Sequence, residues 1–138
     1  ALVMRETAEF FDAMKDLLAE HPGDLAGGVR AAAQYMLSVA HDNPLLQTIL
    51  TLTPAHGDDI SLLSLLTIRG EPLIGRATDS LGAWVREQWP SANAEDVRLM
   101  VESVVRLCLS YILTPTRPAQ EAADDLALVA CRCLPLPD

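Results

Sequence analysis

Proline and glycine, which tend to end helices, recur along the whole length of this sequence. The spacing of these breaks restricts the fold more than any other feature. Between the breaks, apolar residues recur every three or four positions, which is the pattern of helices with one buried face. No segment shows the alternation of apolar and polar residues that is typical of strands. Aromatic residues make up only 4% of the chain, while Ala and Leu dominate, which also favours helix over sheet. The sequence therefore predicts an all-α fold, and its 138 residues suit one domain that spans residues 1–138.

The breaks predict about seven helices. We expect them to cover residues 2–20, 25–39, 44–52, 60–68, 72–89, 94–113 and 119–133. Asp24 and Asn93 stand directly before two of these helices and are residue types that cap helix N-termini. The segment 69–72 (RGEP) is expected to end the fourth helix, because Pro72 suits the first position of a new one.

The last two predicted helices carry more apolar residues than one buried stripe needs. At 100° per residue, the apolar arc of the helix over 94–113 covers roughly 240°, against roughly 100° for a helix with one wet face. Two antiparallel helices of this kind suit a four-helix bundle made with a second copy of the chain about a two-fold axis. The residues expected at this homodimer interface are Val101, Val104, Val105, Cys108, Ile112, Leu126, Val129, Ala130 and Cys133. The alternative is that both helices lie at the centre of a monomeric bundle.

The charge balance and the cysteines indicate the class of protein. The net charge is 10 − 19 = −9, and an acidic surface repels phosphate, so these residues alone should bind neither nucleic acid nor an anionic membrane. No uncharged apolar stretch reaches the roughly 18 residues that a membrane helix needs. Three cysteines without regular spacing suggest reduced thiols rather than disulfides. We therefore expect a soluble, cytoplasmic protein.

The sequence contains no pattern typical of catalysis or of a metal centre. None of the histidines, His21, His41 and His56, has another histidine three or four positions away. Cys131 and Cys133 point about 200° apart on a helix, so they do not form a metal-binding pair. No phosphate loop, nucleophile elbow or zinc-protease motif occurs. We expect neither an enzyme nor a cofactor.

The order of these segments resembles a known family. The stretch EDVRLMVESVVRLCLSYILTPTRP, residues 95–118, is similar to the start of the last two helices of TetR/AcrR-type transcriptional regulators. Residues 5–36 resemble the long helix that follows the DNA-binding domain in that family, together with the next helix, and 41–50 resemble the short segment after it. The resemblance implies a C-terminal ligand-binding and dimerisation domain. It also implies that DNA is contacted only through an N-terminal helix-turn-helix domain, which we expect to be absent from these residues.

The resemblance further implies a small hydrophobic or amphipathic effector, bound among the first, second, fourth and fifth predicted helices and the inner side of the sixth. Met adapts to varied ligand shapes, and Tyr and Trp each offer one hydrogen bond from an apolar wall. The candidate effector-binding residues are Phe10, Phe11, Met14, Tyr35, Met36, Trp84 and Met100, although each could equally be ordinary core. The predicted function is effector sensing in a transcriptional repressor. The alternatives are a stand-alone helical adaptor that binds a partner protein through its C-terminal hairpin and, less favoured, a small lipid carrier.

Overall fold

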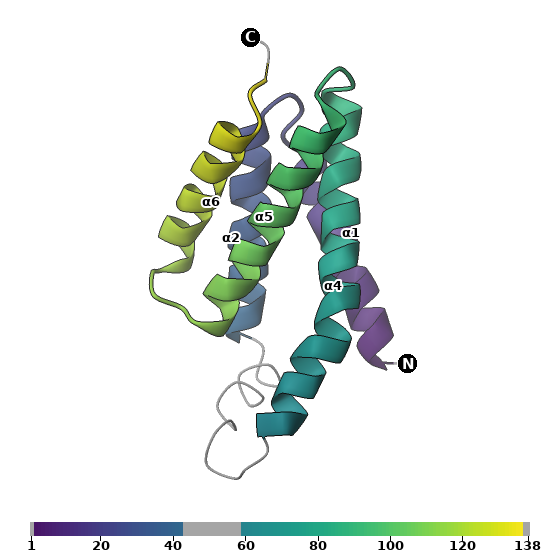
Figure 1. Ribbon diagram of the computed structural model, residues 1–138, viewed down its shortest axis with the longest axis vertical. Coiled ribbons are helices and arrows are strands. Elements are labelled where there is room, and N and C mark those ends of the chain that lie inside the picture. The colour runs from purple at the N-terminus through teal and green to yellow at the C-terminus, as the bar shows by residue number, and fades with distance from the viewer. Residues whose placement is uncertain (1, 43–58, 137–138) are drawn as a thin grey trace.

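The computed structural model describes the backbone of residues 2–42 and 59–136, and within these ranges the side chains of residues 9–42 and 74–136. Its helices are α1 (Leu2–Ala19), α2 (Leu25–Asp42), α4 (Asp59–Gln88), α5 (Ala94–Leu113) and α6 (Ala119–Cys133). Successive helices run in alternating directions along the bundle, as Figure 1 shows. The part of the chain that the structure describes contains no strand, which confirms the all-α prediction.

The predicted helix bounds agree with the structure at both ends of the chain but not in the middle. The prediction that residues 69–72 separate two helices is wrong, because α4 continues through Pro72 as one helix of 30 residues. A proline inside a helix removes one backbone hydrogen bond and bends the helix without necessarily ending it. Figure 1 shows such a bend in the N-terminal half of α4. The helix expected over 44–52 lies outside the described residues, which contain five helices rather than seven.

Two predicted helix caps are confirmed. The side chain of Asp24 accepts a hydrogen bond of 3.0 Å from the backbone N–H of Gly27 at the start of α2. Asn93 accepts hydrogen bonds of 2.9 Å from Glu95 N–H and 3.1 Å from Asp96 N–H at the start of α5. Each side chain satisfies donors that have no partner within the first turn of the helix, so both helices begin where the sequence predicts.

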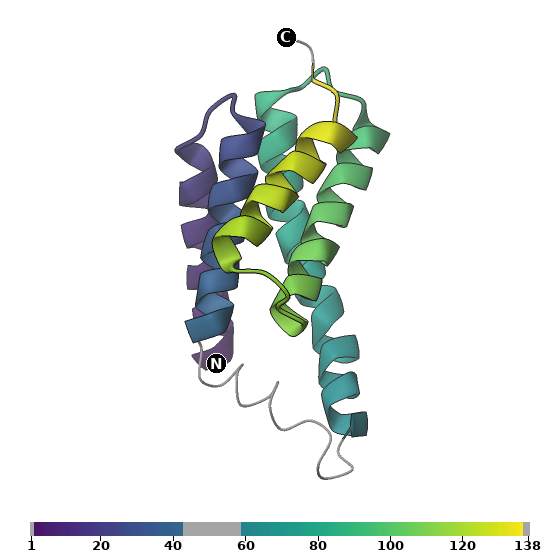
Figure 2. The same cartoon turned by 90° about the vertical axis from the view of Figure 1, so that its left-hand side faces the viewer.

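Helix α2 contacts each of the other described helices. It packs against α1 and α5, and its contact with α6 is the most extensive between any two described helices. Helix α4 packs against α1 and α5 on the other side of the bundle. Figure 2 shows α6 lying across α2, with α1 at one side and α4 and α5 at the other. None of the described helices is both long and apolar enough to cross a membrane.

The contact between α2 and α6 depends on small side chains. Apart from Leu126, the buried residues of α6 are all alanines: Ala122, Ala123, Ala127 and Ala130. Small residues let two helix axes approach closely, which increases the contact between their backbones and side chains. Arg30 of α2 and Asp124 of α6 add an exposed ion pair, with 2.7 Å between Nε and Oδ1. The last helix is therefore held against its own chain.

Trp84 joins α4 to α2 at the end of the bundle where these helices meet the first loop. Its ring lies so close to Gly28 that a β-carbon added there would be 2.5 Å from the nearest ring atom. Its centroid is 5.6 Å from that of Trp89, with the two ring planes nearly perpendicular. Nearby, Gly23 donates a backbone hydrogen bond of 2.7 Å to the side-chain oxygen of Gln88. Gly28 is therefore a site of close packing between helices.

Replacing Gly28 with alanine should destabilise the fold, although alanine is the better helix former. We expect Gly28→Ala to lower the free energy of unfolding by about 1–3 kcal/mol, because Trp84 must shift to admit the methyl group. Gly75 of α4 is the matched control, since a β-carbon there meets no atom within 4 Å. Gly75→Ala should raise stability by up to about 1 kcal/mol. Urea unfolding followed by tryptophan fluorescence measures both changes, and a Gly28→Ala variant as stable as the parent would contradict the packing role.

Candidate functional site

A small apolar cavity lies at the centre of the bundle, where four helices meet. Its volume is about 30 Å³. The residues that line it are Met14 of α1, Val29, Ala32, Ala33 and Met36 of α2, Ala77 and Leu81 of α4, and Val104, Val105 and Cys108 of α5. A space of this size holds about one water molecule, yet its walls offer almost no hydrogen bonds to a water. The cavity is therefore suited to apolar atoms and has to widen before it can accept a larger ligand.

Two of the predicted effector-binding residues, Met14 and Met36, line this cavity. Three others form an aromatic cluster between α1 and α2: Phe10 stacks on Tyr35 with 5.5 Å between ring centroids and meets the ring of Phe11 edge-on at 5.2 Å. The guanidinium carbon of Arg76, on α4, lies 4.6 Å from the centroid of the Phe11 ring. The cluster thus joins three helices.

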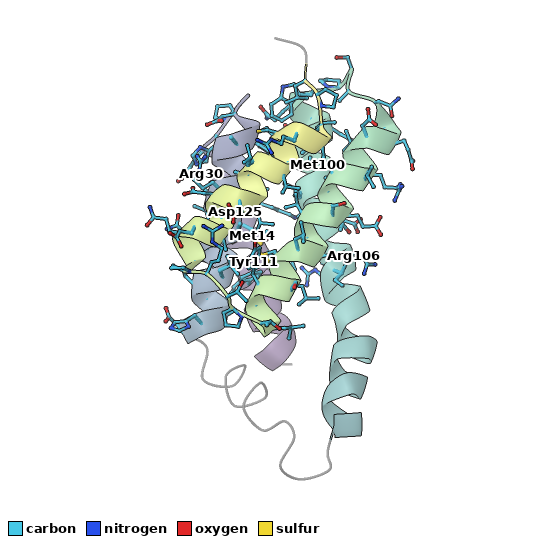
Figure 3. All side chains as sticks on the ribbon, turned by 60° about the vertical axis from the view of Figure 1, so that its left-hand side comes forward. Met14, Arg30, Met100, Arg106, Tyr111 and Asp125 are labelled. Atoms are coloured by element: carbon cyan, nitrogen blue, oxygen red, sulfur yellow. The ribbon has the colours of Figure 1, made fainter. Side chains whose placement is uncertain are left out.

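The remaining two predicted effector-binding residues do not line the cavity. Trp84 packs on Gly28 and is buried, and its indole N–H has no hydrogen-bond partner among the residues that the structure describes. Met100 of α5 is completely buried. Figure 3 shows Met100 nearer than Met14 to the end of the bundle from which the C-terminus leaves. Whether any of the seven residues contacts an effector stays a prediction.

A larger hollow of about 220 Å³ opens on the surface between α4 and α5. It is lined by Ile74, Thr78, Asp79, Gly82, Arg86, Arg98, Val101 and Glu102. Arg98 is engaged there in ion pairs with Glu95, at 2.5 Å, and with Glu102, at 2.9 Å, and the pair with Arg98 lowers the pKa of Glu95. Its walls carry both signs of charge, so the smaller central cavity, whose walls are uncharged, fits an apolar effector better.

Comparison with known proteins identifies the family. The family model described as "Bacterial Tetracyclin repressor, C-terminal domain" matches residues 24–132, which is most of the chain. The chain belongs to this TetR family.

One regulator and one solved structure are similar to this chain. The HTH-type transcriptional regulator AlkX of Mycobacterium tuberculosis is 35% identical over 66 residues, which cover 48% of this chain and 31% of that protein. The crystal structure of the TetR family repressor AlkX from a Dietzia species, described as implicated in biodegradation of n-alkanes, superposes with a TM-score of 0.68 at 24% identity. That superposition covers 92% of this chain and 65% of the other, and it shows a shared fold. The chain thus spans less than two thirds of either relative.

Most residues that we predicted to face a second TetR-family chain are already covered by their own chain. Val101, Val104, Val105, Cys108, Leu126 and Ala130 are buried, and Ile112, Val129 and Cys133 are half-buried. A side chain that is buried within one chain has almost no surface left to lose to a partner. Val104, Val105 and Cys108 line the central cavity instead. The helical wheel of α5 is apolar on two sides, and only the position of α2 and α4 shows which side is inside.

The apolar surface that remains exposed is nevertheless on the last two helices. Among residues 9–42 and 74–136, the large hydrophobic side chains that are strongly exposed are Leu99 (52%), Leu107 (41%) and Leu128 (49%). Leu99 and Leu107 belong to α5, and Leu128 belongs to α6. At 100° per residue Leu99, Ser103 and Leu107 follow one another along one side of α5. The expected excess of apolar surface on this hairpin is therefore present, but different residues carry it.

Cys108 faces the cavity as a neutral thiol. Its Sγ donates a hydrogen bond to Sδ of Met36 at 3.3 Å, and burial raises its pKa from 9.0 to about 12. Cys131 is exposed and Cys133 is half-buried. Within the described residues, no three His, Cys, Asp or Glu side chains come close enough together to hold a metal ion.

The three thiols should therefore differ in reactivity. At pH 9, about one in a thousand Cys108 thiols is ionised if its pKa is about 12, and the thiolate is the reactive form. We expect a disulfide reagent to titrate Cys131 and Cys133 quickly in the native chain, and Cys108 only after denaturation. Counting released thiolate before and after addition of guanidinium measures this, with Cys108→Ala as the control. Three fast thiols in the native chain would show that Cys108 is accessible.

Proposed function

We propose that this chain is the effector-binding and homodimerisation domain of a TetR-family transcriptional repressor. The observation that carries the proposal is the central cavity, which brings side chains of α1, α2, α4 and α5 together around an apolar space. An effector bound there contacts four helices at once, so it can change their relative positions. Since the chain spans 31% of its Mycobacterium relative, we assign DNA binding to a part of the whole protein outside these residues.

The walls of the cavity favour an alkyl chain as the effector. All of its lining side chains are aliphatic or contain sulfur, and none carries a charge at neutral pH. A ligand with buried polar groups would leave these groups without partners, at a cost of about 1–3 kcal/mol each. The Dietzia AlkX repressor, which shares the fold, is described as implicated in n-alkane biodegradation, and this supports the same ligand class.

Binding requires the cavity to expand, and its lining makes this feasible. Met14 and Met36 have flexible, unbranched side chains that can adopt new rotamers around a ligand. Because Met14 belongs to α1, a ligand that displaces it pushes directly on this helix. In our proposal α1 transmits the signal, since a domain that precedes residue 2 is joined to the bundle through it. The ligand shifts the equilibrium only as far as it binds one arrangement better than the other.

Filling the cavity should abolish effector binding. We expect medium-chain alkanols such as 1-decanol to raise the melting temperature of the parent chain. At a ligand concentration of a hundred times the dissociation constant, binding should raise the free energy of unfolding by about 2.7 kcal/mol. Ala33→Leu places a larger side chain in the cavity and should weaken binding at least about tenfold. Ala83→Leu, at an exposed position of α4, is the matched control and should bind as the parent does.

Fluorescence of Trp84 and Trp89 gives a second measure of binding in the same titration. Ala77→Val adds only two carbons to the cavity wall and provides the test if Ala33→Leu does not fold. Binding that is equally strong in the parent, Ala33→Leu and Ala77→Val would place the effector elsewhere. A parent chain that responds to no alkyl compound would contradict the sensing role.

We also propose that two copies associate through the exposed leucines of α5 and α6. Leu99, Leu107 and Leu128 leave apolar surface in contact with water, and a stable interface of standard size buries about 1,600 Å² in total. The buried members of the predicted interface support these residues from inside the bundle instead of meeting the partner.

Charges placed on this face should separate the two copies. We expect the parent to sediment as a dimer of a 14.9 kDa chain at micromolar concentration. The double variant Leu107→Glu/Leu128→Glu should sediment as a monomer, because association would bury four carboxylates without partners. Ala83→Glu, on the exposed side of α4, should stay dimeric. A parent chain that is monomeric at tens of micromolar would refute self-association and favour the adaptor, in which the same leucines bind another protein.

A further inference from the structure

Three sulfur-containing side chains from three different helices line the central cavity. They are Met14 of α1, Met36 of α2 and Cys108 of α5. The Sγ atom of Cys108 is 3.3 Å from Sδ of Met36, and all three residues border the same space of about 30 Å³. Apart from these sulfurs, the lining side chains are hydrocarbon. Three residues with soft sulfur donors thus border the cavity, and none of its lining residues has a side-chain nitrogen or oxygen donor.

We propose that Met14, Met36 and Cys108 together bind one soft monovalent cation, Cu(I) or Ag(I), inside the bundle. Thiolate and thioether ligands select Cu(I), whereas imidazole and carboxylate ligands suit Zn²⁺, Mg²⁺ and Ca²⁺. The cavity offers no side-chain oxygen or nitrogen, so it disfavours the harder ions. This proposal does not depend on effector sensing or on dimerisation.

The distance between the sulfurs of Met36 and Cys108 is close to that required by a three-coordinate ion. Metal–sulfur bonds of about 2.3 Å in a trigonal plane require sulfur atoms about 4.0 Å apart. The sulfurs of Met36 and Cys108 therefore have to separate by about 0.7 Å from their present 3.3 Å. The thioether of Met36 can make this shift by a change of rotamer into the adjoining cavity, since Met is unbranched and flexible. The ion then fills space between the sulfurs that is too apolar to hold water well.

Charge and proton balance also suit a monovalent ion. On binding, the Cys108 S–H bond breaks, a sulfur–metal bond forms, and the proton leaves to solvent. The product pairs one positive ion with one thiolate and two neutral thioethers, so no net charge is buried. A divalent ion would leave an uncompensated positive charge in an apolar interior, which is costly. Each bound ion should therefore displace one proton.

The test measures Cu(I) and Ag(I) binding to the full chain in competition with a coloured chelator, without oxygen for Cu(I). Cys131 and Cys133 are accessible thiols that bind the same ions, so Cys131→Ser/Cys133→Ser is the reference protein. In this background we expect one ion per chain. Cys108→Ser should weaken binding at least about a hundredfold, and Met36→Leu and Met14→Leu at least about tenfold each, since even outer-shell partners of metal ligands contribute about 10–100-fold.

Met100→Leu is the matched control, because Met100 is a fully buried methionine that does not line the cavity. It should change the affinity by less than about twofold, as expected for an isosteric swap outside the site. The affinity should also fall about tenfold for each pH unit below 7, since one proton is released. X-ray absorption of the bound ion should show sulfur neighbours alone.

Three outcomes would overturn the proposal: no binding to the reference protein, binding that Met14→Leu and Met36→Leu leave unchanged, or a bound ion with nitrogen or oxygen neighbours. The methionine variants decide the question if Cys108→Ser fails to fold. Loss of ion binding together with an intact response to 1-decanol would refute this site and leave the effector proposal standing. Ion binding without any response to 1-decanol would refute the effector proposal and leave this site standing.

Discussion

The close packing of α6 on α2 is the contact on which the rest of the structure depends. The buried face of α6 consists mostly of alanines, which let it approach α2 closely, and Arg30 with Asp124 joins the exposed edges of the two helices. Because α6 covers α2 in this way, the C-terminal hairpin belongs to the core of its own chain. Two consequences follow: the apolar side of α5 is turned inward against α2 and α4, and only a few leucines remain outside.

Helix α5 has a different role on each of its sides. Cys108 points inward and lines the central cavity, while the adjacent residue Leu107 is 41% exposed on the outside. Consecutive residues of a helix point about 100° apart, so one helix can form both the wall of a ligand site and part of an interface. In the function that we propose, a ligand that displaces α5 therefore acts on the contact between two copies with no intermediate element. Helix α1 contributes Met14 to the same cavity. In the proposed function, a ligand there would therefore act both on α1, which transmits the signal, and on α5, which is part of the interface between copies.

Local signals in the sequence were sufficient for part of this structure. Asp24 and Asn93 cap the helices that they were expected to cap, because a cap is a contact within one turn of the chain. Pro72 shows where local signals fail: a proline suits the first turn of a new helix, but it also occurs inside a continuous, bent one. The local sequence does not decide between these cases, because a proline is compatible with both.

The candidate site, too, was predicted from the sequence only in part. The sequence by itself determined that the chain is all-α, that it resembles and belongs to the TetR family, and that its last two helices carry surplus apolar residues. It also picked out Met14 and Met36 as adaptable apolar residues, and both line the cavity. Only the tertiary structure decided which side of α5 is inside, so that Val104, Val105 and Cys108 line a cavity while Leu99 and Leu107 face outward. The physical reason is that a helix apolar on two sides has no preferred inner face until α2 and α4 pack against one of them.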